Sequence, residues 1–393
     1  MIASERGGIT PHRRGFLGGL CSCAMLSLAG CVTQHGNEPP LTSGYKPVSS
    51  TDEGGLWHVM NRVENDIKRS RHLIRDPAWD AYLRDIMTRL SADFSNDMRI
   101  YLMRTPYFNA TMAPNGMMQV WTGLLLRVDN EAELAAVLGH EMGHYMQRHS
   151  LAKLRDARAR SDFATLLSVG LGAAGSLAGM AVMAGHFAFN REQEREADDI
   201  GLRLMTQAGY TPIAASEVWQ QLSEEQKVDP NPKNESVMFA THPSNDERMN
   251  TLRSKAEESG AKGEAFAERY RERIRGIRFM LLEDELRLRQ YERSLVLLQR
   301  LQKEVPGDGE LIYFEAEAYR LRDKDGDRTL AQTTYERALL AADAPPQAWR
   351  SLGLVQRRDG RREAAQQSFK KYLDLRPDAE DRAIILSYME KSA

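Results

Sequence analysis

The sequence has little cysteine and no excess of positive charge. All three cysteines lie within the first 31 of its 393 residues, so a chain cleaved there has neither a disulfide pair nor a thiolate metal site. The net charge of −2 argues against a general nucleic-acid-binding protein, which would carry a basic excess. The chain is 42% hydrophobic, which excludes a disordered protein and suffices for the cores of two or three domains. Any metal site must therefore use His and carboxylate ligands.

The N-terminus has the features of a secretory signal. Arg13 and Arg14 precede a short apolar stretch that ends in small residues, and the arginine pair resembles a twin-arginine export signal. Residues 28–31 (LAGC) resemble a bacterial lipobox, which implies cleavage before Cys31 and acylation of its sulfur. Val32 after the cysteine, in place of an Asp, implies anchoring at the periplasmic face of the outer membrane. An uncleaved N-terminal anchor is the alternative.

Changes in composition and periodicity divide the chain into four segments. Residues 1–30 are the signal peptide, and residues 31–55, rich in Pro, Gly and Ser, predict a lipidated cysteine and a flexible tether. Residues 56–255 mix helical periodicity with extended stretches, which indicates a mainly α domain with a small β-sheet. Residues 265–393 read as a series of short amphipathic helices.

The sequence HEMGH at residues 140–144 is the strongest chemical signal. It lies in a stretch of helical periodicity for which Asn130 and Glu133 predict an N-terminal capping box. Four residues advance a helix by about 400°, so both imidazoles leave one face and can share a zinc ion. Glu141 then lies beside the metal, where it can take a proton from a bound water. A structural pair of helix histidines is the alternative.

A charged run, residues 190–201 (NREQEREADDIG), offers a third ligand that is not sulfur. Taken alone, such a run is typical of a solvated helix face. Glu194 and Asp198, however, are four residues apart, so Glu194 can reach the zinc while Asp198 accepts a hydrogen bond from a ligand imidazole. Glu192 and Glu196 point elsewhere on the helix and are poorer candidates.

These motifs together resemble the M48 family of zinc peptidases, which includes HtpX-like and CAAX-prenyl-processing proteases. HExxH is followed about fifty residues later by E-x-E-A-D-x-x-G, as in that family. Three further stretches match the family: residues 109–125, residues 208–212 and Thr241-His242-Pro243 with Arg248. In the first stretch, Asn115 stands where the family has a glycine. The matches cover about residues 70–255.

The resemblance implies a zincin-type metallopeptidase domain with one Zn²⁺ per chain. It implies His140, His144 and Glu194 as the metal ligands and Glu141 as the catalytic base. We expect Asp198, from its spacing, and Arg248, which can orient carboxylates or substrate, to lie behind the ligands.

His242 has three interpretations. It occupies the open zinc position at rest, it stabilises the oxyanion during turnover, or it is a loop histidine without a role. His149 has no assigned partner and reads as structural, and Arg191 gives only a weak signal.

The apolar stretch 163–189 is long enough to span a bilayer once. A single crossing would place His144 and Glu194 on opposite sides of the membrane, which a shared metal forbids. The stretch therefore predicts a hairpin or helix packed on the protein, or one in contact with the lipid surface.

The C-terminal segment shows tetratricopeptide spacing, a repeat of about 34 residues that forms a helix pair. The clearest unit covers residues 348–377, a second runs from about Leu311, and a weaker third ends at Pro306. Helix pairs of this kind stack into a curved surface that binds peptides or proteins. A spacer array without a ligand is the alternative.

The motifs and the family resemblance together imply a membrane-anchored zinc metalloendopeptidase. The resemblance implies that it degrades misfolded or stalled periplasmic and outer-membrane proteins. Met118, Gln119 and Val120 form the strand predicted to align an extended substrate. The expected partners are unfolded protein substrates, the outer-membrane assembly machinery through the repeats, and the membrane through the lipid anchor, without nucleic acid. A chaperone or scaffold whose zinc site is shut or structural is the first alternative. A prenyl-type intramembrane enzyme is the second.

Overall fold

The structure is a computed structural model that describes residues 40–159, 189–231, 237–242 and 246–390. The predicted signal peptide, Cys31, Pro243 and all of the apolar stretch except Phe189 lie outside these described residues. Within the described ranges, no helix is long and apolar enough to cross a membrane.

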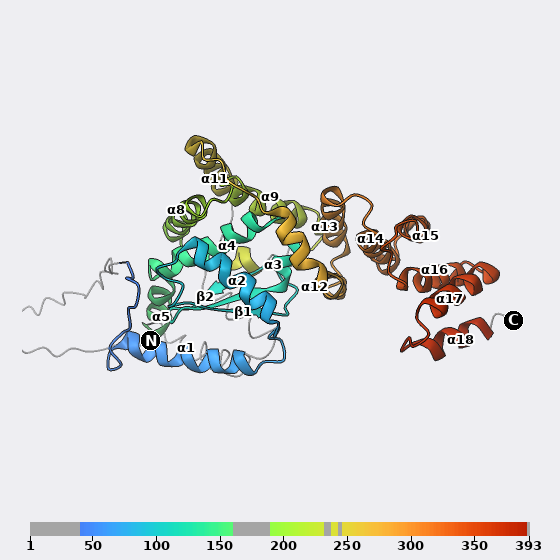
Figure 1. The fold of residues 1–393 in the computed structure, drawn as a ribbon, viewed down its shortest axis with the longest axis horizontal. Coiled ribbons are helices and arrows are strands. Elements are labelled where there is room, and N and C mark those ends of the chain that lie inside the picture. Colours follow the sequence, from blue (N-terminus) through green and yellow to red (C-terminus); the bar gives the residue numbers. More distant parts are fainter. Residues whose placement is uncertain (1–39, 160–188, 232–236, 243–245, 391–393) are drawn as a thin grey trace, which may run out of the picture. The chain divides into compact units, whose positions relative to one another are not determined.

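A small three-stranded sheet in the N-terminal part has the helix of residues 52–69 below it and other helices above it (Figure 1). The strand order is β1-β3-β2, with β1 parallel and β2 antiparallel to β3. The elements of this part are α1 (Asp52–Arg69), α2 (Pro77–Leu90), β1 (Arg99–Met103), β2 (Ala110–Met112), β3 (Met117–Trp121), α3 (Thr122–Arg127), α4 (Glu131–Met146) and α5 (His149–Ala159).

The sheet topology corrects the predicted substrate strand. Met118, Gln119 and Val120 lie in β3, which pairs with β1 on one side and with β2 on the other. A strand with both neighbours in place has no free main-chain edge for another chain. The prediction that these three residues align the substrate is therefore wrong, and the strand beside α4 is the outer strand β2.

Residues 40–55 are also ordered where the sequence predicted a flexible tether. The Leu41 N–H donates a hydrogen bond to the Met146 carbonyl (2.8 Å) at the end of α4. Thr51 caps α1, since its hydroxyl accepts a hydrogen bond from the Gly54 N–H (3.1 Å). The described part of the predicted tether therefore forms turns and a helix cap at Thr51, and its Leu41 contacts the end of α4.

Four further helices complete the part that surrounds α4. Helix α4 packs against β2 below and against α8 and α9 above (Figure 1). The four helices are α8 (Arg191–Gln207), α9 (Ala214–Lys227), α10 (Val237–Thr241) and α11 (Asp246–Ser259).

The C-terminal region is a run of helix pairs, which confirms the predicted helical region after the first domain. Its helices are α12 (Ala267–Arg287), α13 (Tyr291–Glu304), α14 (Gly309–Arg322), α15 (Asp327–Ala338), α16 (Gln347–Arg358), α17 (Arg362–Leu375) and α18 (Arg382–Glu390). In the last full pair, a Cβ at Gly353 would lie 2.6 Å from the Phe369 ring, so the two helices approach through the glycine. One continuous hydrophobic cluster runs from α2 through α4 to α16.

Candidate metal centre

Helix α4 carries the HEMGH sequence through the middle of the core. It begins as predicted at Asn130, whose side chain accepts a hydrogen bond from the Glu133 N–H (3.0 Å). The Glu133 carboxylate accepts a hydrogen bond from the Asp129 N–H (2.8 Å). Every residue from Glu131 to Tyr145 is buried, so His140, Glu141 and His144 face the protein interior.

Glycines let α4 and α8 approach closely enough to bring their side chains together. A Cβ at Gly143 would lie 2.8 Å from the Ala197 carbonyl oxygen, and one at Gly201 would lie 2.8 Å from the His140 backbone nitrogen. These distances are shorter than any normal contact, so both positions require glycine. The glycine inside HEMGH therefore sets the helix contact that places α8 over the two histidines.

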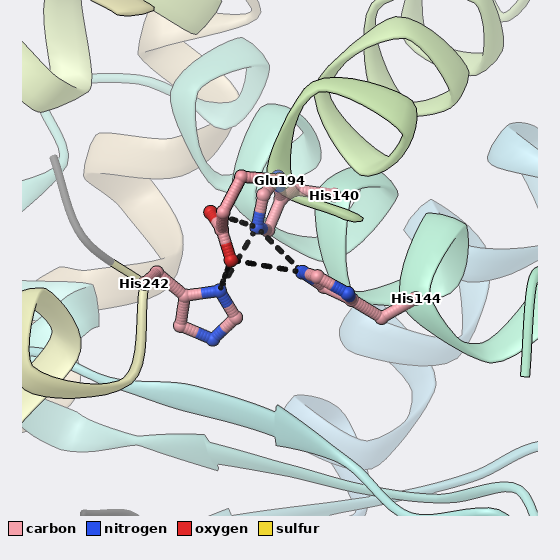
Figure 2. Close-up of side chains that lie close together, drawn as sticks. All are labelled: His140, His144, Glu194 and His242. Atoms are coloured by element: carbon pink, nitrogen blue, oxygen red, sulfur yellow. Dashed lines mark hydrogen bonds and ion pairs between the residues drawn. The ribbon is translucent and has the colours of Figure 1, made fainter. Parts of the chain in front are cut away.

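The contact produces a buried cluster of His140, His144, Glu194 and His242 (Figure 2). The Nε2 atoms of His140 and His144 lie 3.1 Å apart. Glu194 oxygens lie 3.6 Å from His140 Nε2 and 3.4 Å from His144 Nε2. His242, which follows α10, has its Nδ1 atom 2.9 Å from Glu194 Oε1 and 3.1 Å from His140 Nε2.

These separations fit a tetrahedral metal ion. Four ligand atoms at zinc–nitrogen and zinc–oxygen bond lengths are separated from one another by about 3.3 Å. Five pairs of these nitrogen and oxygen atoms are 2.9 to 3.6 Å apart, and one donor atom from each residue lies within 4.8 Å of the others. Imidazole and carboxylate are ligands that zinc accepts. The site residues therefore fit the zinc ion that the sequence predicts.

Asp198 and Arg248 support the cluster from behind. Asp198 Oδ1 lies 2.9 Å from His140 Nδ1, the ring nitrogen that faces away from the cluster. Arg248 donates two hydrogen bonds to the Asp198 carboxylate, both 2.8 Å, and its Nη1 lies 2.6 Å from Glu194 Oε2. The buried Arg248 guanidinium thus holds both the Asp198 carboxylate behind His140 and the Glu194 carboxylate inside the cluster.

Burial and these partners shift the pKa values in different directions. Burial lowers the pKa of His144 well below its usual value, which keeps the imidazole neutral. Burial opposes the charged form of His140 as well, but Asp198 outweighs it and raises the pKa of His140. Burial would raise the pKa of Asp198, yet Arg248 holds it below the usual value. Asp198 is therefore a carboxylate at neutral pH and accepts a hydrogen bond from His140 Nδ1.

Glu141 lies beside the cluster and outside its set of ligand atoms. Its side chain is 2% exposed, and its Oε1 atom has no hydrogen-bond partner. The nearest ring is that of His242, whose Nε2 atom lies 3.4 Å from Oε1. Burial raises the pKa of Glu141. An unpaired buried oxygen with increased proton affinity can receive a proton from a water or substrate group in the cluster.

Four residues near the cluster were not assigned a role from the sequence. Phe189 stacks on the His144 ring (3.8 Å between centroids), and Trp219 of α9 lies 5.1 Å from the Arg248 guanidinium. His149 and Glu196 bond to each other behind His144. Helical periodicity places Glu196 on a different side of α8 from Glu194, so Glu196 was not expected near the cluster. Nothing in the sequence indicates that α5 would bring His149 into contact with Glu196.

Comparison with known proteins identifies the domain that holds this cluster. Residues 77–256 match the sequence model of Peptidase family M48. These residues form a peptidase family M48 domain. The four cluster residues and Glu141 all lie within the M48 domain, which makes this part of the chain a metalloprotease domain.

Curated relatives of the M48 domain are proteases. The chain is 34% identical over 167 residues to the mitochondrial metalloendopeptidase OMA1 of Schizosaccharomyces pombe, covering 42% of this chain and 48% of that protein. It is 30% identical over 206 residues to the putative beta-barrel assembly-enhancing protease of Vibrio cholerae, covering 48% and 42%. It is 27% identical over 198 residues to the metalloprotease LoiP of Escherichia coli, covering 47% and 75%. The matched segment thus spans less than half of each of the first two relatives.

Proposed function

We propose that the protein is a zinc-dependent metalloendopeptidase that cleaves unfolded or misassembled proteins in outer-membrane protein quality control. The observation that carries this proposal is the buried cluster of three imidazoles and one carboxylate beside Glu141, whose Oε1 atom has no hydrogen-bond partner. A structural metal site would need the ligands but not this unpaired acid. Relatives named for beta-barrel assembly and for metalloprotease activity support the substrate class.

His140, His144 and Glu194 would hold the zinc ion. When bound, zinc polarises a scissile carbonyl and lowers the pKa of a coordinated water. Glu141 Oε1 takes the proton of the attacking water and returns it to the amine that leaves. Because its pKa is raised by burial, Glu141 has the proton affinity that both transfers require.

His242 supplies a fourth donor atom in this structure. Its Nδ1 atom lies 2.9 Å from Glu194 Oε1, inside the cluster, while its Nε2 atom faces Glu141. This placement supports the first interpretation from the sequence, in which His242 occupies the open zinc position at rest. With substrate bound, His242 would move out of the cluster, and its ring could then stabilise the oxyanion.

The outer strand β2 is the surface that aligns the substrate in place of β3. Within the described residues, β2 has β3 as its only partner in the sheet, and it packs against α4. Asn109, immediately before β2, is fully buried, and neither side-chain polar atom has a hydrogen-bond partner. Main-chain hydrogen bonds between β2 and an extended substrate would give binding that tolerates many sequences.

The N-terminal and C-terminal regions complete the proposal. The signal peptide (residues 1–30) and the acylated Cys31 would place the protein at the periplasmic face of the outer membrane. The helix pairs of residues 265–393 are tetratricopeptide repeats that present substrates or dock the outer-membrane assembly machinery. The order of helix pairs from α12 to α17 supports this assignment.

Casein cleavage by the wild type and by Glu141→Gln tests the proposal. Gln preserves the shape of the side chain but cannot accept the proton, so cleavage should fall about 100- to 10,000-fold while the bound zinc remains. The rival function is a chaperone or scaffold with a shut zinc site, which the fourth donor His242 favours. Equal cleavage rates for the two proteins would support that rival.

A further inference from the structure

The two histidines of HEMGH are supported from behind in different ways. His140 has Asp198 and Arg248 behind its Nδ1 atom. His144 Nδ1 instead lies 2.9 Å from the Nδ1 atom of His149, the first residue of α5. On the far side of that ring, His149 Nε2 lies 2.9 Å from Glu196 Oε2. The ring of His149 therefore links His144 to Glu196.

The positions of the protons along this chain follow from the chemistry of each group. A carboxylate only accepts hydrogen bonds, so His149 Nε2 carries the proton that it donates to Glu196. A neutral imidazole has one N–H, which leaves His149 Nδ1 as an acceptor. His144 Nδ1 must then be the donor between the two rings. With its proton on Nδ1, His144 has an unprotonated Nε2, and that is the atom 3.1 Å from His140 Nε2.

We propose that His149 is a positioning residue that fixes the tautomer and ring orientation of His144 for metal binding, and that Glu196 fixes the tautomer of His149. The inference deepens the proposed function and rests on it. His149 contacts His144 at Nδ1, not at the Nε2 atom that would bind the metal, so it acts only through His144.

Burial indicates how strongly each group contributes. The His149 side chain is 7% exposed, so no water can easily replace its Nδ1 atom behind the buried His144. The Glu196 side chain is 48% exposed, so water can take over part of its role as acceptor. Replacement of His149 should therefore weaken metal binding more than replacement of Glu196.

The test uses the purified full chain, with zinc affinity measured by chelator competition and the visible spectrum recorded after loading with Co²⁺. His149→Phe keeps a flat ring but removes the acceptor, and it should lower zinc affinity about 10- to 100-fold and change the Co²⁺ spectrum. His149→Asn places an amide oxygen near the Nδ1 position and should restore most of the affinity. Glu196→Ala should lie between wild type and His149→Phe.

Glu192→Ala is the matched control for Glu196→Ala, because Glu192 also lies on α8, is 71% exposed and pairs with Arg195. It should bind zinc like the wild type. Thermal unfolding of the metal-free proteins separates positioning from a structural role, because a positioning residue changes metal affinity and leaves the metal-free melting temperature nearly unchanged.

Two results would overturn the inference. Equal zinc affinity of His149→Phe and wild type would show that His144 needs no such partner. A fall in the metal-free melting temperature with unchanged zinc affinity would make His149 structural. If the wild type itself bound no zinc and cleaved no casein, the proposed function would fail together with this inference. If the wild type binds zinc and cleaves casein, either of the two results above contradicts only the role given to His149.

Discussion

At the scale of single residues, the site depends on which side chain stands behind each ligand. The sequence predicted the pairing of Asp198 with a ligand imidazole, because Glu194 and Asp198 are one helical turn apart. The structure places Asp198 behind His140 at 2.9 Å. The sequence could not predict the contact with His149, because that contact depends on a turn between α4 and α5 through Arg148, whose backbone is left-handed (φ 60°).

Asp198→Asn should weaken zinc binding by about 10- to 100-fold, as measured by chelator competition. The amide can still accept a hydrogen bond from His140, but it loses the ion pair with Arg248. Asp199→Asn is the matched control, since Asp199 is adjacent, 53% exposed and paired with Lys255 on the surface. Equal zinc affinities for Asp198→Asn and Asp199→Asn would contradict the role given to Asp198.

At the scale of elements, the contact between α4 and α8 makes the site. Periodicity predicted both helices, and capping predicted the start of α4 alone. The capping box at Asn190 that begins α8 was not predicted from the sequence. The sequence pattern did not predict the sheet order that leaves β2 outermost, because strand pairing is a long-range property that local patterning does not determine.

Gly143→Ala tests the helix contact. The new Cβ would lie 2.8 Å from the Ala197 carbonyl, which must push the helices apart. We expect a loss of about 1–3 kcal/mol in the free energy of unfolding, measured with urea on the metal-free protein, together with weaker zinc binding.

Gly276→Ala in α12 is the control for that substitution. No atom lies within 4 Å of its Cβ position, so the change should stabilise the protein by about 1 kcal/mol through helix propensity alone. A stabilising effect of Gly143→Ala would show that the close contact between α4 and α8 is not required.

At the scale of the whole molecule, buried charges connect the M48 domain to the C-terminal helices. Arg127 of α3 is 3% exposed and donates hydrogen bonds to Glu225 of α9 (2.7 Å) and Glu285 of α12 (2.9 Å). The sequence predicted two separate segments, and it could not predict this link, because residues up to 158 positions apart meet only in the folded chain.

Arg127→Met should destabilise the protein by about 3–5 kcal/mol, because it leaves two carboxylates buried without their shared partner. Urea unfolding measures the change. Arg362→Met, at an exposed position of α17, should alter the free energy of unfolding by less than about 0.5 kcal/mol. A similarly small effect of Arg127→Met would show that the buried ion pairs do not hold the two parts together.

The most direct test of the whole account is the metal content of the purified protein, determined by elemental analysis for the wild type and for Glu194→Ala. If His140, His144 and Glu194 hold one zinc ion, the wild type contains one zinc per chain and Glu194→Ala loses it during dialysis against a weak chelator. A wild type without zinc, or a Glu194→Ala protein that retains a full equivalent, would contradict the account.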